Sequence, residues 1–186
     1  MHRLIRPALT ALSIAVAAAS FASVTTDRAM AQQGGGAPTQ LKQIALTQKQ
    51  IDGAIAAQKD MDAITSKLQP NSKPDAKVLA QIDAIAKKNG FANTDEYYTV
   101  MDNISLVYGG IDPATKKYVG SEAVIKSQIA DVQADKKMSA NDKKQALDQL
   151  NQALKQPEPA VQNKGNIDLV VKNYDKLSAI MNEDQQ

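Results

Sequence analysis

Apolar residues recur every three or four positions along most of this chain, which is the spacing of one face of an α-helix. No segment alternates apolar and polar residues for long enough to require a strand. The predicted helices span residues 47–69, 74–89 and 93–108, and Ser121, Ser139 and Asn166 are expected to cap three further helices. The pattern therefore predicts an all-α fold, a single-domain bundle of about six helices within residues 40–182, four longer and two shorter.

Polar capping residues, prolines and glycines set the bounds of these helices. Thr47 and Gln50 fit a capping box, in which each side chain accepts a hydrogen bond from the other's backbone N–H. Pro74 suits the first position of the second helix, because that position needs no N–H donor. Two consecutive glycines at 109–110 end the third helix, and residues 112–115, DPAT, suit a type I turn.

The segment before the first helix has two interpretations. Leu41, Ile44 and Leu46 either extend this helix toward the N-terminus or pack as a short irregular arm. Residues 32–39, QQGGGAPT, are typical of a flexible tether, because three glycines and a proline cannot hold a helix. At the other end of the chain, residues 183–186 form a short polar tail.

Aromatic residues are concentrated between Phe91 and Gly120, which include five of the six that lie beyond residue 31. One face of the predicted third helix carries Tyr97, Met101, Ile104 and Tyr108, at spacings of four, three and four. This face is expected to be buried. Tyr98 is rotated from it by about 100° and is expected to face solvent or a functional site.

Four residues near the glycine turn form the candidate ligand-binding site: Tyr98, Tyr108, Asp112 and Tyr118. A tyrosine ring offers an apolar surface and a polar hydroxyl, so three of them can line a small pocket. The alternative is that the tyrosines are the largest core residues available in a chain with few aromatics. Asp112 likewise has an alternative role, because aspartate is favoured at the first position of a turn.

The N-terminus has the three parts of a cleavable Sec signal peptide over residues 1–31. These are a basic start with Arg3 and Arg6, an apolar run over residues 11–22, and the small-residue tripeptide Ala29-Met30-Ala31. The apolar run is shorter than the roughly 20 residues of a membrane-spanning helix. We therefore expect a periplasmic or secreted protein with no stable membrane insertion after cleavage.

Removal of residues 1–31 changes the chemistry of the chain. The full chain has 22 basic and 20 acidic residues. Because three arginines and one aspartate lie in the signal peptide, the mature chain has 19 lysines and 19 acids. It would contain no Arg, His, Cys or Trp.

Those missing residue types exclude several classes of chemistry. Without His or Cys there is no imidazole base, no thiol nucleophile and no usual zinc or haem ligand. Without Arg or net positive charge, nucleic-acid binding loses its electrostatic basis. We therefore expect no catalytic site, no metal, no cofactor and no nucleic-acid partner. The remaining hypotheses are an interaction protein with protein clients and a module that binds a small ligand.

Two stretches resemble known families. Leu46-Thr47-Gln48-Lys49-Gln50 matches the LTxxQ motif of the Spy-like periplasmic chaperones, and this resemblance implies an all-α protein that cradles clients or senses envelope stress. More of the chain, including LTQKQIDGAIAAQKDMDAI and GFANTDEYYTVMDNISLVYGGIDPATKKY, is similar to a group of exported, uncharacterised helical proteins of alphaproteobacteria. That second resemblance implies export and a helical fold but no chemistry.

Overall fold

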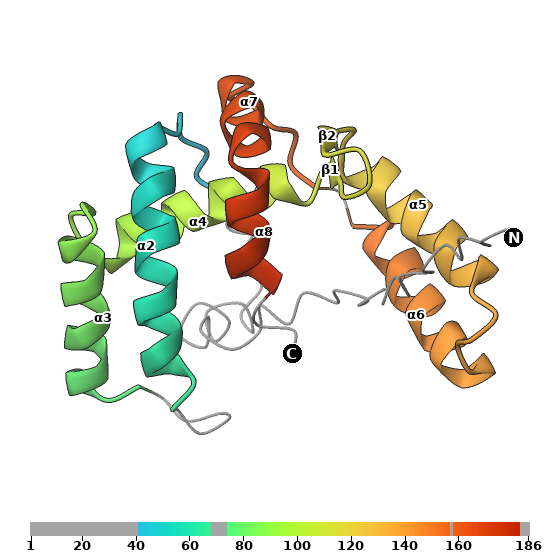
Figure 1. Cartoon of the computed structure of the whole chain (residues 1–186), viewed down its shortest axis with the longest axis horizontal. Coiled ribbons are helices and arrows are strands. Elements are labelled where there is room, and N and C mark those ends of the chain that lie inside the picture. Colours follow the sequence, from blue (N-terminus) through green and yellow to red (C-terminus); the bar gives the residue numbers. More distant parts are fainter. Residues whose placement is uncertain (1–40, 68–73, 157, 183–186) are drawn as a thin grey trace, which may run out of the picture.

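The computed structural model describes residues 41–67, 74–156 and 158–182 (Figure 1). The expected signal peptide (1–31), tether (32–39) and tail (183–186) lie outside the described residues. The first helix ends at Thr65, with Ser66 as its C-cap residue, so the prediction that it continues to residue 69 is wrong. The all-α prediction is confirmed, with seven helices in the described part of the chain. They are α2 (Gln48–Thr65), α3 (Ala76–Lys88), α4 (Thr94–Tyr108), α5 (Ser121–Ala134), α6 (Ala140–Ala153), α7 (Gly165–Lys172) and α8 (Tyr174–Asn182).

The helix count differs from the predicted six because the last expected helix is divided at Asn173. The backbone there lies at φ −101° and ψ 10°. The Asn173 amide donates to the Leu169 carbonyl at 2.8 Å and exchanges two 3.1 Å hydrogen bonds with the Gln48 side chain of α2. The division therefore allows a buried amide to tie the bend to α2. Five helices have 13 to 18 residues, and α7 and α8 have 8 and 9.

Three predicted helix starts are confirmed by side-chain caps. Thr47 accepts from the Gln50 N–H at 3.2 Å, and Gln50 accepts from the Thr47 N–H at 3.0 Å, which completes the capping box. Asn93 caps α4 and Ser139 caps α6 by the same type of contact. Residues 41–46 lie outside the helix as an irregular arm, the second of the two interpretations.

Three other starts differ from the prediction. Asp75 caps α3, because its carboxylate satisfies a backbone N–H at 2.8 Å, and Pro74 precedes the helix. Gly120 is the N-cap residue of α5, and Ser121 is its first helical residue. Asn166 lies inside α7, because its side chain is bonded to the backbone of the arm before α2.

A small antiparallel ribbon connects α4 to α5. Its strands are β1 (Ile111–Asp112) and β2 (Lys117–Tyr118), with Ile111 opposite Tyr118. The Asp112 carbonyl accepts from the Lys116 N–H at 2.8 Å, and Lys116 has a φ of 55°. The chain therefore turns where predicted, but the backbone hydrogen bond spans one residue more than in a type I turn. The ribbon that it closes is too short to produce an alternating pattern.

Five helices form the body of the molecule in two layers (Figure 1). α2, α3 and the α7–α8 pair lie side by side, and α4 crosses them. The predicted face of α4 packs into this core, with Tyr97 and Ile104 buried. The buried apolar residues of the body are Leu46, Ile51, Ala54, Ala57, Met61, Ile82, Ala86, Phe91, Tyr97, Val100, Ile104, Val107, Ile111, Val170, Tyr174 and Leu177.

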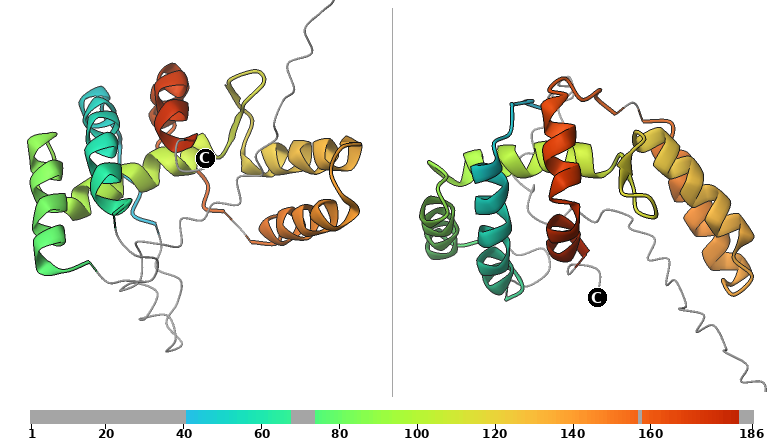
Figure 2. Two further views of the ribbon diagram at one scale, coloured as in Figure 1. Left: turned by 60° about the horizontal axis from the view of Figure 1, so that its bottom comes forward. Right: turned by 45° about the horizontal axis from the view of Figure 1, so that its top comes forward.

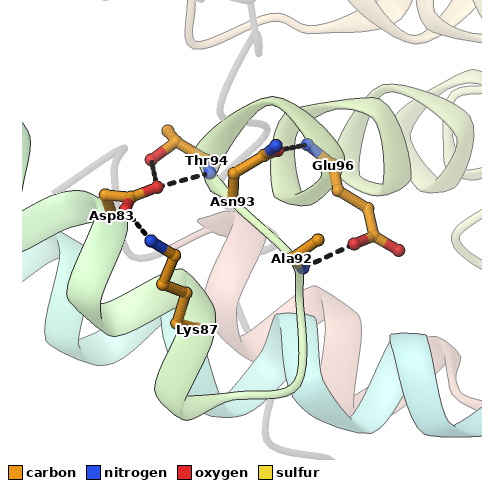
Figure 3. Close-up of polar contacts among 6 residues, drawn as sticks. All are labelled: Asp83, Lys87, Ala92, Asn93, Thr94 and Glu96. Atoms are coloured by element: carbon orange, nitrogen blue, oxygen red, sulfur yellow. Dashed lines mark hydrogen bonds and ion pairs between the residues drawn. The ribbon is translucent and has the colours of Figure 1, made fainter.

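A polar cluster fixes the corner between α3 and α4 (Figure 3). Asp83 accepts from the Thr94 N–H at 3.2 Å and from its hydroxyl at 3.3 Å, and it pairs with Lys87 at 2.8 Å. Beside it, the Glu96 carboxylate accepts from the Ala92 N–H at 2.6 Å. The hydrogen bonds from Lys87 and Thr94 lower the pKa of Asp83.

α5 and α6 form a hairpin that projects from the body (Figures 1 and 2). Three of its buried residues, Val132, Ala146 and Leu150, form a hydrophobic cluster distinct from the core of the body. The hairpin is attached by the β1–β2 ribbon before α5 and by the residues between α6 and α7. Both attachments lie at the same end of the hairpin, which creates a joint between hairpin and body.

Candidate functional site at the joint between body and hairpin

An open groove of about 400 Å³ lies at this joint. α4, the β2–α5 junction and the residues that follow α6 each contribute to its surface. Val119 is 48% exposed, a large fraction for a β-branched apolar side chain. The apolar or small lining residues are Leu106, Tyr118, Val119, Gly120, Ala123, Pro159, Ala160 and Val161.

Two glycines position Tyr118 and Val119. The Tyr118 ring lies against Gly110, where a Cβ atom would collide with it. The Gly110 carbonyl accepts from the N–H groups of both Val119, at 2.8 Å, and Gly120, at 3.0 Å. Gly120 has a φ of +89°, which a glycine adopts without strain, and directs the chain into α5. Together these contacts present Val119 at the surface between body and hairpin.

The opposite wall is held by a glutamine from the arm before α2. Gln43 Nε2 donates to the Ala160 carbonyl at 2.8 Å, and Gln43 Oε1 accepts from the Gln162 N–H at 2.8 Å. One side-chain amide thus bonds to the peptide groups on both sides of Val161. This fixes the irregular segment after α6 against the body.

Charged side chains border the groove. Lys126 Nζ lies 2.6 Å from Glu122 Oε1, and both side chains are exposed. The hydrogen bond and charge of Lys126 lower the pKa of Glu122. Glu158 adds a second carboxylate to the border. The groove therefore has both apolar and charged side chains in its lining, a combination found in many protein interaction surfaces.

A second hollow of about 260 Å³ continues from the groove along the base of the hairpin. It shares Ser121, Glu122 and Glu158 with the groove. Ile125 and Leu154, both half-buried, add apolar surface to it. The two hollows are therefore neighbours around the start of α5, and the side chains that they share are polar.

The structure brings one of the four candidate site residues, Tyr118, into the groove. Tyr108 instead stacks on Tyr174 of α8, with ring centroids 5.2 Å apart and an interplanar angle of 11°. Burial, followed by the hydrogen bond with Tyr108, raises the pKa of Tyr174. Asp112 accepts from the Thr115 N–H at 2.7 Å and its hydroxyl at 3.0 Å, and these bonds lower the pKa of Asp112.

Tyr98 lies near the opposite end of α4 from Tyr108, about 15 Å along the helix axis at a rise of ~1.5 Å per residue. Its ring contacts Tyr97 edge-on, with centroids 5.3 Å apart, and it is half-buried against the core of the body. Burial raises the pKa of Tyr98. The four candidates therefore do not converge on one pocket, and a role for each in ligand binding stays a prediction.

Two residues of the groove escaped the sequence analysis, Leu106 and Val119. Leu106 belongs to the predicted third helix but not to the face that the tyrosine spacing marked. Val119 follows Tyr118 and precedes a glycine, so it belongs to no predicted helix face. An apolar residue outside every amphipathic face has no predicted partner in the core. This feature of Val119 could have marked it as a candidate surface contact.

Residues 41–67, 74–156 and 158–182 contain no group of three His, Cys, Asp or Glu side chains placed to hold a metal ion. Over the same ranges, each helix is too short or too polar to cross a bilayer.

Comparison with known proteins gives no match to a family model, to a curated protein or to a solved structure. The resemblances to LTxxQ chaperones and to exported alphaproteobacterial proteins stay expectations from the sequence.

Proposed function

We propose that this chain is a non-enzymatic, chaperone-like interaction protein of the periplasm, which holds an apolar segment of a partner protein at the joint groove. The observation that carries this proposal is the exposure of Val119 in the lining of a groove of about 400 Å³. Val119 and Leu79 are the two large apolar residues that are strongly exposed in the described chain, and of these only Val119 lines the groove. Exposed apolar surface that is bordered by polar residues is typical of interaction sites.

The size of the groove favours weak and reversible binding. Burial of one Leu-sized or Val-sized side chain contributes about 1.5–3 kcal/mol, which corresponds to roughly a tenfold to hundredfold gain in affinity. The second hollow beside Ile125 and Leu154 extends the contact to a neighbouring side chain of the partner. A holding protein needs this kind of binding, because it must release its client.

The expected signal peptide supports the proposed location. A mature chain with equal numbers of lysines and acids, and without His, Cys or Arg, supports binding by apolar contact over catalysis. The LTxxQ resemblance points to the same class of protein, although its five residues lie at the start of α2 and not in the groove.

Suppression of aggregation tests this proposal. The purified mature chain is added in increasing amounts to a reduced model client, and light scattering is followed. We expect Val119→Asp to reduce suppression at least fivefold, because a carboxylate would have to be desolvated in the groove. Leu79→Asp is the matched control, since Leu79 is 54% exposed on α3, at the other end of the body.

Two outcomes would count against the proposal. One is no suppression by the wild-type chain at a severalfold molar excess. The other is an equal loss of suppression in Val119→Asp and Leu79→Asp, which would mean that the client binds exposed apolar residues without preference for the groove.

A second candidate function is a small-ligand module, favoured by the volume of the groove and by Tyr118 in its wall. Ligand pockets commonly have volumes of about 300–1,000 Å³. Thermal-shift screening of a small-molecule library would detect such a ligand. A shift that Tyr118→Ala removes and Tyr98→Ala retains would assign the ligand to the groove, whereas shifts unchanged in both variants would exclude it there.

A further inference from the structure

Two buried asparagines grip the backbone of the arm that precedes α2. Asn103 of α4 accepts from the Ile44 N–H at 3.0 Å and donates to the Lys42 carbonyl at 2.9 Å. Asn166 of α7 accepts from the Leu46 N–H at 2.8 Å and donates to the Ile44 carbonyl at 2.8 Å. Each side-chain amide therefore bonds to the two peptide groups that flank one residue of the arm.

These contacts resemble the pairing of a strand with a neighbour. In a parallel ladder, one residue bonds to the peptide groups on both sides of its partner residue. The Asn103 side chain bonds to the peptide groups on both sides of Gln43. The Asn166 side chain bonds to those on both sides of Ala45, two residues further along the arm. We call Asn103 and Asn166 the amide clamp. Their exposed fractions are only 1% and 3% with the arm in place, so the clamp and the arm meet in the interior of the molecule.

From Ile44 to Thr47, the side chains alternate between the body and solvent. Leu46 is buried at 6% exposure and Ile44 is half-buried against the same core. Lys42 and Ala45 are exposed. The site therefore recognises an extended segment through its backbone and through two apolar side chains, two residues apart.

We propose that the amide clamp is a binding site for extended segments of a partner polypeptide with apolar side chains at positions i and i+2, and that the arm is its built-in competitor. The clamp bonds to main-chain atoms of the arm, so a segment of another chain with the same two apolar positions presents the same groups. This site is separate from the joint groove, and the inference goes beyond the proposed function.

The arm also connects the two sites. Its Gln43 holds the peptide groups around Val161, which lines the groove. When a partner segment replaces the arm, Gln43 leaves with it and that wall of the groove loses these two hydrogen bonds. Occupation of the clamp therefore changes the shape of the groove.

Peptide binding to the full mature chain tests the clamp. The probe is a fluorescent peptide with the sequence of residues 41–47, LKQIALT, read by fluorescence anisotropy. In the wild type, the arm competes at the millimolar effective concentration of a tethered segment. In the variant Ile44→Ser with Leu46→Ser, the arm loses both apolar contacts but keeps every peptide group. We expect this variant to bind the peptide at least tenfold more tightly than the wild type.

The matched control is Lys42→Ser with Ala45→Ser, which changes two exposed positions of the same arm and should bind as the wild type does. A second peptide of the same composition, with its Ile and Leu adjacent, should bind at least tenfold more weakly to the arm-weakened variant. Equal affinity for both peptides, or equal affinity of both variants, would overturn the proposal. A further outcome is that wild-type chains dimerise by exchanging arms and bind no free peptide. This outcome would show that the clamp binds the arm of a second copy, and it would also overturn the proposal.

Amide exchange in the wild type tests the proposal even if the arm-weakened variant fails to fold. The Ile44 and Leu46 N–H groups should exchange at least tenfold faster than those in the middle of α2, because the arm opens while the body stays folded. Arm amides that exchange only as slowly as the core of α2 would show that the clamp does not release its own arm. None of these measurements depends on aggregation suppression, so the two proposals fail independently.

Discussion

At the level of single residues, the joint groove depends on a glycine that has no space for a side chain. The Tyr118 ring occupies the position where a Cβ atom of residue 110 would lie. Gly110→Ala must push this ring away or shift the β1–β2 ribbon. Tyr118 and the neighbouring Val119 would then both be displaced in the groove.

We predict that Gly110→Ala lowers the free energy of unfolding by about 1–3 kcal/mol, the usual cost of overpacking. Urea denaturation followed by circular dichroism would measure it. Gly165→Ala is the control, since no atom lies within 4 Å of the corresponding Cβ position and alanine favours the helix. Equal stability of the wild type and Gly110→Ala would mean that the ring moves freely at this contact.

Residue contacts were predictable where they are local. The capping box of Thr47 and Gln50 joins residues three apart, so the sequence displays both partners. Asn166 shows the opposite case, because its type favours a helix cap but its side chain bonds to Ile44 and Leu46, more than a hundred residues away. No local pattern distinguishes these two uses of an asparagine.

At the level of elements, the corner between α3 and α4 links stability to pH (Figure 3). Hydrogen bonds from Lys87 and Thr94 lower the pKa of Asp83 in the folded chain, so the unfolded chain takes up this proton first. The stabilising effect of Asp83 is therefore complete above the ordinary aspartate pKa of about 3.9 and is lost as the pH falls through the lower folded value.

We predict that Asp83→Asn reduces stability at pH 6 and reduces it less at pH 3. The stability of the variant should therefore fall less on acidification than that of the wild type. Urea midpoints at both pH values would show this. Asp148→Asn, a change on the exposed surface of α6, is the matched control. An identical acid dependence in Asp83→Asn and the wild type would contradict the role of this corner.

The hairpin should unfold more easily than the body because its buried cluster is small. Leu150→Ala truncates one of the three buried residues of this cluster, at a cost of about 2–5 kcal/mol. We predict faster amide exchange throughout α5 and α6 and unchanged exchange in α2 and α4. Leu177→Ala, in the core of the body, should have the reverse effect. Equal acceleration of α2 by Leu150→Ala would show that hairpin and body unfold together.

Most elements followed from periodicity and caps, and the exceptions have a tertiary cause. The last predicted helix is divided at Asn173 because this residue bonds to Gln48 of α2. The two-residue strands of the ribbon were not predicted, since alternation cannot be recognised over so short a length.

At the level of the whole molecule, the all-α class was predictable and the arrangement of the helices was not. The apolar faces of α5 and α6 look like those of the other helices, yet they pack mainly on each other. The joint groove is a consequence of that separation. The candidate site drawn from the tyrosines therefore included Tyr118 but not Leu106 and Val119, which reach the groove through long-range packing.

Site-specific crosslinking is the most direct test of whether partner proteins bind at the joint groove. The natural chain contains no cysteine, so one cysteine can carry a benzophenone label at a chosen position. Val119→Cys places the label in the groove, and Leu79→Cys places it on the exposed surface of α3. Each labelled chain is mixed with an unfolding client and irradiated. We predict at least fivefold more crosslinked client from position 119 than from position 79. Equal or greater crosslinking from position 79 would contradict binding of the client at the joint groove.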